Sequence, residues 1–143
     1  MREYEEIRRF LNEQGRDLLQ SGPLSELPRK RRQDLFNGDA ATIWLVRDVE
    51  DGNAIIAHLS VHWRQTMRRK VGTIENLLVH PRVRCEGVGR MLMAHTIAHA
   101  RTVGCDRLEL VSELHRIRAR ALYDKFGFQR VGKSDCHFQL DLK

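Results

Sequence analysis

Residues 72–101 read GTIENLLVHPRVRCEGVGRMLMAHTIAHAR, a stretch that predicts a strand, a glycine-bearing turn and then a long helix. Residues 73–79 hold Thr, Ile, Leu, Leu and Val in near-continuous order rather than in alternation, which is typical of a strand covered on both faces. Pro81 ends this strand, because proline has no N–H for a ladder and restricts the residue before it. From Val88 to about residue 103, apolar side chains recur at helical spacing, so we expect a helix that packs on the sheet.

The turn between strand and helix has the composition of an anion-binding loop. Its two glycines, Gly87 and Gly89, allow the backbone to approach a ligand closely, and the first N–H groups of the following helix have no partner within that helix. Such a helix end attracts anions, and Arg82, Arg84 and Arg90 add positive charge to it. By itself a pair of glycines is more often an ordinary tight turn, so the interpretation depends on what surrounds the pair.

Two motifs together resemble the GCN5-related N-acetyltransferases. These are Arg84-x-x-Gly87-x-Gly89, directly after a buried strand, and the sequence YDKFGF at residues 123–128. The likeness extends from about residue 41 to the C-terminus. It implies an α/β fold, assigned to α+β in some schemes, with three αβα layers and a mixed, mostly antiparallel sheet whose parallel central pair is flanked by helices. A dinucleotide-binding fold is the nearest alternative, but Leu92 stands where its third glycine would be.

The same resemblance implies that acetyl-coenzyme A is the co-substrate and that a primary amine attacks its thioester directly in a ternary complex. In this family the glycine-bearing loop holds the pyrophosphate, and the preceding strand pairs through its backbone with the pantetheine arm. Backbone groups of that strand can also polarise the thioester carbonyl, as oxyanion donors do. The residues that we expect to bind the coenzyme are Leu77, Leu78, Val79, Arg84, Cys85, Glu86, Gly87, Val88, Gly89 and Arg90, with Arg120 and Lys125 as candidates for the adenosine 3′-phosphate.

Tyr123 is the candidate general acid. A phenol with a pKa of about 10 keeps its proton at neutral pH and can donate it to a leaving thiolate. In the family that this chain resembles, a tyrosine at this position commonly donates to the coenzyme sulfur. The alternative is an aromatic side chain that fills the seam between sheet and helix.

Glu75 is the candidate general base. A carboxylate on an otherwise buried strand is costly unless it is used or paired, and many members of the family carry an acidic residue here that relays the amine proton through water. The alternative is that Glu75 pairs with an arginine of residues 64–70 and is structural. Asn76 beside it is a further candidate for the acceptor pocket.

The remaining reactive side chains give weaker signals. His95 and His99 have the spacing of a helical zinc pair, but Thr96 stands where the glutamate of zinc peptidases would be, so we expect no metal and a solvated helix face. His58, His62 and His137 are candidates for lining the acceptor pocket. Cys85 within the loop would permit an acetyl-cysteine intermediate, but direct attack fits the resemblance better.

The chain is expected to form one N-acetyltransferase domain over residues 1–143, because its length suffices for a single core. Residues 1–40 are expected to be helical, and the strand that normally opens the family's domain is expected to be missing or reduced to the first residues. Residues 41–111 would hold the central sheet and the coenzyme-binding unit, and residues 112–143 a helix and a hairpin. The helices expected outside the central stretch span residues 4–19, 25–36 and 119–126, and the strands span residues 41–48, 54–63, 107–111, 128–131 and 137–142.

Charge and composition bound the partners and the compartment. The chain has 25 Lys and Arg against 19 Asp and Glu, a formal charge of +6 that favours a polyanion such as coenzyme A. A basic nucleic-acid-binding module and a non-catalytic acyl-coenzyme A sensor are the alternative classes, but basic runs are more often solvated faces. The three cysteines are odd in number, widely spaced and in no Cys-x-x-Cys pair, which indicates a reducing, cytoplasmic location. The absence of a long apolar run argues against a membrane, and we expect a monomer or homodimer that acts on an amine small molecule or peptide.

Overall fold

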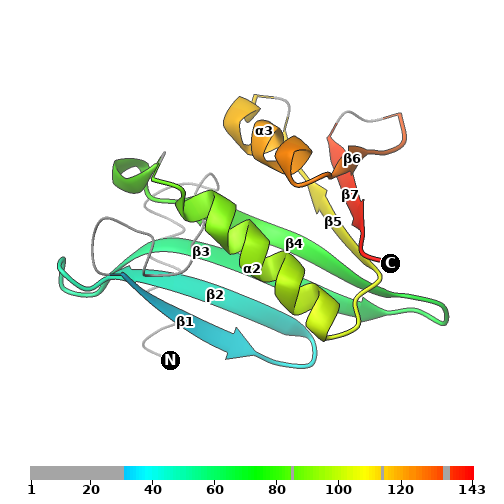
Figure 1. The fold of residues 1–143 in the computed structure, drawn as a ribbon, viewed down its shortest axis with the longest axis horizontal. Coiled ribbons are helices and arrows are strands. Elements are labelled where there is room, and N and C mark those ends of the chain that lie inside the picture. The colour runs from blue at the N-terminus through cyan, green and yellow to red at the C-terminus, as the bar shows by residue number, and fades with distance from the viewer. Residues whose placement is uncertain (1–30, 85, 114, 134–135) are drawn as a thin grey trace.

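The computed structural model describes residues 31–84, 86–113, 115–133 and 136–143, which form a seven-stranded sheet with helices laid against it (Figure 1). The strand order is β1-β2-β3-β4-β5-β7-β6. The strands are β1 (Arg31–Asn37), β2 (Ala41–Asp48), β3 (Ala54–Gln65), β4 (Lys70–Val79), β5 (Arg107–Val111), β6 (Gln129–Arg130) and β7 (His137–Asp141). The helices are the 3₁₀ turn η2 (Pro81–Val83), α2 (Val88–Thr102) and α3 (Ile117–Lys125).

The sheet is mixed, as the sequence predicts. β4 and β5 form its parallel pair, and the other neighbouring strands in the order pair antiparallel. A parallel pair needs a crossover, which here is α2. The strand, turn and helix expected from the central stretch are therefore confirmed, and so is the strand at residues 107–111. No helix among the described residues is long and apolar enough to cross a membrane.

The helix expected over residues 25–36 is wrong for its described part. Residues 31–37 form β1, which pairs antiparallel with β2 from Arg31↔Asp48 to Asn37↔Thr42. Helix propensity is a weak prior, and Asn-Gly, taken as the end of a helix, is also the strongest short signal for a hairpin. Here it opens the β1–β2 turn, where the Gly38 N–H donates to the Ala41 carbonyl at 2.9 Å. The helix expected at residues 4–19 and the start of the second helix lie outside the described residues.

One face of the central strands is covered by α2, which lies across β2, β3 and β4 (Figure 1). Leu92, Met93 and Ile97 of the helix are buried against Val61 and Ile74 of β3 and β4. This packing fixes the start of α2 at the end of β4, and that placement determines where the loop between them lies.

A close approach of side chains at Gly72 adds to this core. A Cβ atom at Gly72 would lie 2.6 Å from the ring of Trp63 and 2.8 Å from a methyl group of the fully buried Leu108. Real Cβ atoms do not approach other heavy atoms so closely, so any side chain here must displace a packed neighbour.

We expect Gly72→Ala to lower the free energy of unfolding by about 1–3 kcal/mol, the usual cost of overpacking a core. Urea denaturation followed by circular dichroism measures the change. Gly38→Ala is the matched control, because a Cβ there meets only an ordinary 3.5 Å contact. Equal stability of the two variants would contradict the packing described for Gly72.

His99 was expected on a solvated face of the long helix, but it packs between two tryptophans. Its ring centroid lies 5.4 Å from that of Trp44 and 6.0 Å from that of Trp63. Its buried Nε2 has no hydrogen-bond partner among the described residues. Burial, followed by the charge of Lys70, lowers the pKa of His99 below its usual value of 6.5.

The lowered pKa predicts a pH dependence of stability. The unfolded chain binds a proton at His99 more readily than the folded chain, so stability is full above the unfolded pKa and is lost as the pH falls below it. We expect His99→Gln to reduce the fall in melting temperature between pH 7.5 and pH 5.5, as measured by differential scanning calorimetry in matched buffers. His95→Gln, one turn earlier on the same helix, is the control, and an unchanged pH dependence in the His99 variant would contradict the prediction.

Candidate active site

The parallel strands β4 and β5 pair over only a short stretch. They pair only at Val71↔Arg107, Gly72↔Leu108 and Thr73↔Glu109, whereas β4 runs on to Val79 and β5 continues beside β7. In the described part of the chain, residues 74–79 therefore have no pairing partner on β5. The backbone N–H and C=O groups along that edge of β4 are available to a ligand, because an unpaired strand edge seeks hydrogen bonds.

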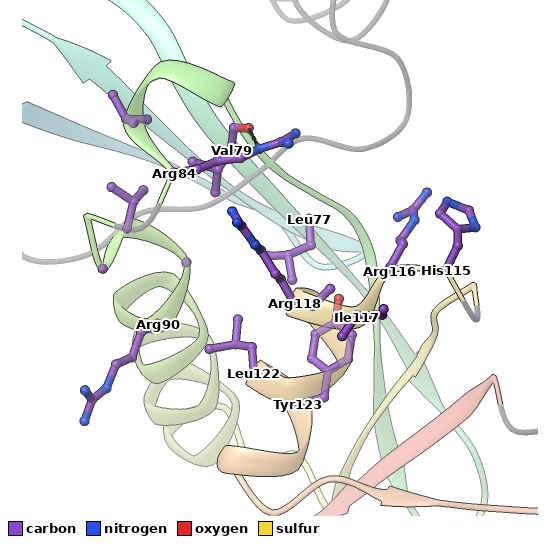
Figure 2. Close-up of a pocket in the computed structure, with 15 residues that line it drawn as sticks. Leu77, Val79, Arg84, Arg90, His115, Arg116, Ile117, Arg118, Leu122 and Tyr123 are labelled. Carbon is purple, nitrogen blue, oxygen red and sulfur yellow. Dashed lines mark hydrogen bonds between the residues drawn. The ribbon is translucent and has the colours of Figure 1, made fainter.

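A cavity of about 590 Å³ opens at this fork (Figure 2). Its walls come from the end of β4, from the loop and first turn that start α2, and from α3 with the residues before it. The lining residues are Leu77, Val79, Val83, Arg84, Gly87, Val88, Gly89, Arg90, His115, Arg116, Ile117, Arg118, Ala119, Leu122 and Tyr123. Its size is in the range of sites for small molecules and cofactors.

The loop that leads into α2 presents a helix N-terminus to the cavity. Gly87 is the N-cap residue with φ 81°, a left-handed conformation that glycine adopts without steric cost. As a glycine, this N-cap residue has no side chain that could cap the helix end. The first backbone N–H groups of α2, which have no partner within a helix, therefore face a space that Val88, Gly89 and Arg90 help to line.

The three arginines of the loop have different settings. Arg84 is exposed, lines the cavity, and donates from Nε to the Val79 carbonyl at 3.4 Å. Figure 2 shows Arg90 pointing away from the cavity on the outer side of α2. Arg82 is outside the lining and is held by carboxylates, with Nη1 at 2.5 Å from Asp51 and Nη2 at 3.9 Å from Asp48.

The second wall contains basic side chains that sequence reasoning had not assigned to the coenzyme. His115, Arg116 and Arg118 all line the cavity, and Arg118 reaches from α3 toward Arg84 across it (Figure 2). The signal was present in the sequence, because residues 116–120 alternate arginine with small or apolar residues directly before the candidate acid. Arg116 stands where the resemblance leads one to expect an asparagine.

Two residues expected at the 3′-phosphate lie outside the lining. Arg120 is buried, with its guanidinium 5.1 Å from the ring centre of Phe138 and Nη1 donating to the Ser112 carbonyl at 3.5 Å. These contacts tie α3 to β5 and β7. Lys125 is exposed at the last residue of α3.

Of the other residues predicted to contact the coenzyme, some line the cavity and some do not. Leu77 and Val79 line the cavity, whereas Leu78 between them is fully buried and contributes only its backbone to that edge. Glu86 is half-buried and outside the lining. Cys85 lies outside the described residues.

Tyr123 lies between the core and the cavity. Its ring is 5.5 Å from that of Phe138 and 5.9 Å from that of Phe128, and only 5% of the residue is exposed. It also lines the cavity. Burial raises the pKa of Tyr123 to about 12, against a smaller opposing effect of the Arg116 charge. The hydroxyl thus keeps its proton throughout the neutral range, and the packing role and the donor role are compatible.

Glu75 has a different setting from the one expected. Its side chain is 52% exposed, so no burial cost needs to be explained, and its Oε2 lies 3.4 Å from Nε2 of His62. Among the arginines of residues 64–70 that were considered as its partner, Arg64 instead lies 3.9 Å from Glu109. Glu75 is outside the cavity lining, two positions before Leu77 on the open edge of β4.

The fork in the mixed sheet, the helix N-terminus with Arg84 beside it and the buried phenol of Tyr123 thus surround one cavity. The sequence matches the acetyltransferase (GNAT) family over residues 4–128, and the chain belongs to that family.

One relative is the mycothiol acetyltransferase of Beutenbergia cavernae, which is 38% identical over 93 residues. The match covers 65% of this chain but 30% of that protein, so this chain spans less than a third of the relative's length.

Solved structures agree on the fold. A putative acetyltransferase from Exiguobacterium sp. 255-15 superposes with a TM-score of 0.59 at 25% identity, covering 74% of this chain and 66% of the other. The NatC complex bound to Gag peptide and CoA gives a TM-score of 0.65 at 22% identity, covering 71% of each chain. Glucosamine-6-phosphate N-acetyltransferase from Arabidopsis thaliana gives 0.60 at 24% identity, covering 68% and 65%. The last two show the fold alone.

The cavity geometry predicts which arginines matter for coenzyme binding. We expect Arg84→Ala and Arg118→Ala each to weaken coenzyme A roughly tenfold, because each removes a charge-assisted contact worth about 1.5 kcal/mol. Arg101→Ala is the control, since Arg101 is exposed near the end of α2 and outside the lining. Isothermal titration calorimetry at low salt gives the three affinities, and an equal affinity of all three variants would contradict the assignment.

Proposed function

We propose that this chain is an acetyl-coenzyme A dependent N-acetyltransferase that moves an acetyl group to a primary amine by direct attack in a ternary complex. The observation that carries the proposal is the fork between β4 and β5, which opens a strand edge beside a helix N-terminus and a protonated phenol. Family membership supports it.

The coenzyme is held by the backbone more than by side chains. Its pyrophosphate would lie on the N–H groups at the start of α2, with Arg84 beside it, because this is the uncapped, positive end of a helix. The pantetheine arm would then extend β4 as an added strand along residues 77–79. Arg118, facing the loop from α3, would neutralise phosphate charge from the other side.

The reaction forms a C–N bond and breaks a C–S bond. The neutral amine attacks the thioester carbonyl carbon, and N–H groups of the β4 edge stabilise the oxygen that becomes negative. Tyr123 then donates its proton to the departing thiolate, which its raised pKa equips it to hold until that point. The second proton, which the attacking nitrogen loses as the amide forms, returns through solvent to the Tyr123 phenolate. Glu75 is the proposed base that takes the proton of the incoming ammonium ion, because it is half-exposed on the same strand edge.

The acceptor is proposed as a primary amine without further identity. One relative is named for mycothiol and one structural neighbour for glucosamine-6-phosphate, and these names do not identify the acceptor of this chain. A screen must therefore span polyamines, amino sugars, amino acids, aminoglycosides and peptide amines. We also propose a reducing, cytoplasmic setting, which the buried free thiol of Cys105 supports.

The proposal is tested by release of coenzyme A thiol from acetyl-coenzyme A across that amine panel. We expect at least one amine to give stoichiometric thiol and acetylated product. Tight coenzyme binding without thiol release on the whole panel would instead support a sensor.

Tyr123→Phe tests the proton donor. Phenylalanine keeps the ring contacts with Phe128 and Phe138, so the melting temperature and coenzyme affinity should stay close to those of the wild type. We expect the single-turnover rate of acetyl transfer to fall about a hundredfold, a typical contribution of general acid catalysis. The wild-type rate should show no loss from Tyr123 ionisation up to pH 9, since the pKa is about 12. A wild-type rate in the phenylalanine variant would reduce Tyr123 to a packing residue.

A further inference from the structure

His62 and Glu75 project from the face of the sheet opposite α2. In an antiparallel ladder, directly paired residues share a face, and the pairs here are Ser60↔Glu75 and His62↔Thr73. The pair between them, Val61↔Ile74, belongs to the core under α2. His62 and Glu75 therefore lie side by side on the other face, where each side chain is 52% exposed.

The two side chains form a defined contact rather than sharing a diffuse charged surface. Nε2 of His62 lies 3.4 Å from Oε2 of Glu75. The next acidic group on this face, Glu109, contacts Arg64 at 3.9 Å and accepts from Nε2 of Gln139 at 3.5 Å. On β3, β4, β5 and β7 the register places these other charged or titratable residues on the same face: His58, Arg64, Arg107, Glu109, His137 and Asp141. The neighbouring carboxylate thus has its own basic partner, and Glu75 is left with an imidazole.

The position of the pair relative to the fork places it where an incoming amine would pass. Thr73 is the last β4 residue paired with β5, and Leu77 is the first that lines the cavity, so Glu75 stands midway between them on the open edge. The α2 N-terminus and α3 form the other walls of the cavity. An amine that reaches the thioester from the face opposite α2 would pass Glu75 first, with His62 behind it on β3.

We propose that His62 is the positioning residue for Glu75 and relays the proton that Glu75 takes from the acceptor to solvent. This inference rests on the proposed function. The acceptor ammonium gives its proton to the Glu75 carboxylate and becomes a neutral amine. The carboxylic acid then passes that proton to the unprotonated Nε2 of His62, and the imidazolium releases it to water.

A relay is needed because bound coenzyme and acceptor would restrict the access of water to Glu75. Once coenzyme and acceptor fill the fork, the side of Glu75 that faces them would lose its water, whereas His62 on the neighbouring strand β3 would keep its own exposed surface. Histidine is suited to this step because its ordinary ionisation lies near neutral pH. An exposed pair of polar side chains contributes little to stability, so breaking a purely structural pair would leave both the fold and the rate of acetyl transfer unchanged.

The test uses the full chain with an amine found active in the panel screen. His62→Gln keeps a hydrogen-bonding side chain beside Glu75 but cannot take up a proton, and His62→Ala removes both properties. We expect His62→Gln to lower the single-turnover rate about tenfold or more with coenzyme A affinity unchanged, and His62→Ala to lower it further. We also expect the acid limb of the kcat/KM profile to lose one ionisation in both variants. Arg64→Gln, from the same face of the same strand, should keep the wild-type profile.

A double-mutant cycle with Glu75→Gln separates the possible outcomes. If His62 acts through Glu75, the effect of His62→Gln disappears in the Glu75→Gln background. A wild-type pH profile in His62→Gln, or an undiminished effect in that background, would overturn the relay while Glu75 kept its role. A wild-type rate in Glu75→Gln would remove the proposed base and the relay together. Absence of thiol release with every amine would overturn the proposed function itself, and the relay with it.

Discussion

The structure depends on how short the pairing between β4 and β5 is. Three residue pairs hold the parallel strands together, although β4 runs on to Val79 and β5 runs on to Val111 beside β7. Because backbone hydrogen-bonding groups must be satisfied by protein, water or ligand, the open edge of β4 becomes a place for an extended ligand. The fork exists because β4 and β5 stop pairing after Thr73 and Glu109, and the cavity lies where the two strands separate.

The elements around the fork each supply a different interaction. α2 is anchored by buried Leu92, Met93 and Ile97, and this packing holds its uncapped N-terminus at the end of β4. α3 is anchored by Arg120 and by the aromatic contacts of Tyr123, which leaves Arg118 on the cavity side. The groups proposed to bind the phosphates and the phenol proposed to donate a proton thus lie apart, and packing of the hydrophobic core fixes the distance between them.

The central unit could be predicted from sequence because its signals are local. One stretch of sequence contains, in order, an apolar-rich strand segment, a proline that ends it, two glycines and a helical stripe of apolar residues. Each of these features determines the conformation of the residues next to it. The strand at Arg31–Asn37 could not be predicted in this way, since its pairing with β2 decides its conformation against moderate helix propensity. The setting of Glu75 and the packing of His99 were missed for a related reason. Both depend on which face of the sheet a helix covers, and an apolar pattern alone does not report that face.

The central claim is that coenzyme A lies along the open edge of β4 with its pyrophosphate at the start of α2. Hydrogen–deuterium exchange with and without saturating coenzyme A tests it directly, because both parts of the site are backbone amides. The account predicts strong protection of peptides that cover residues 74–79 and 86–92, with the β1–β2 hairpin unchanged. Protection confined to other segments, or bound coenzyme that leaves these amides exchanging at their free rate, would contradict it.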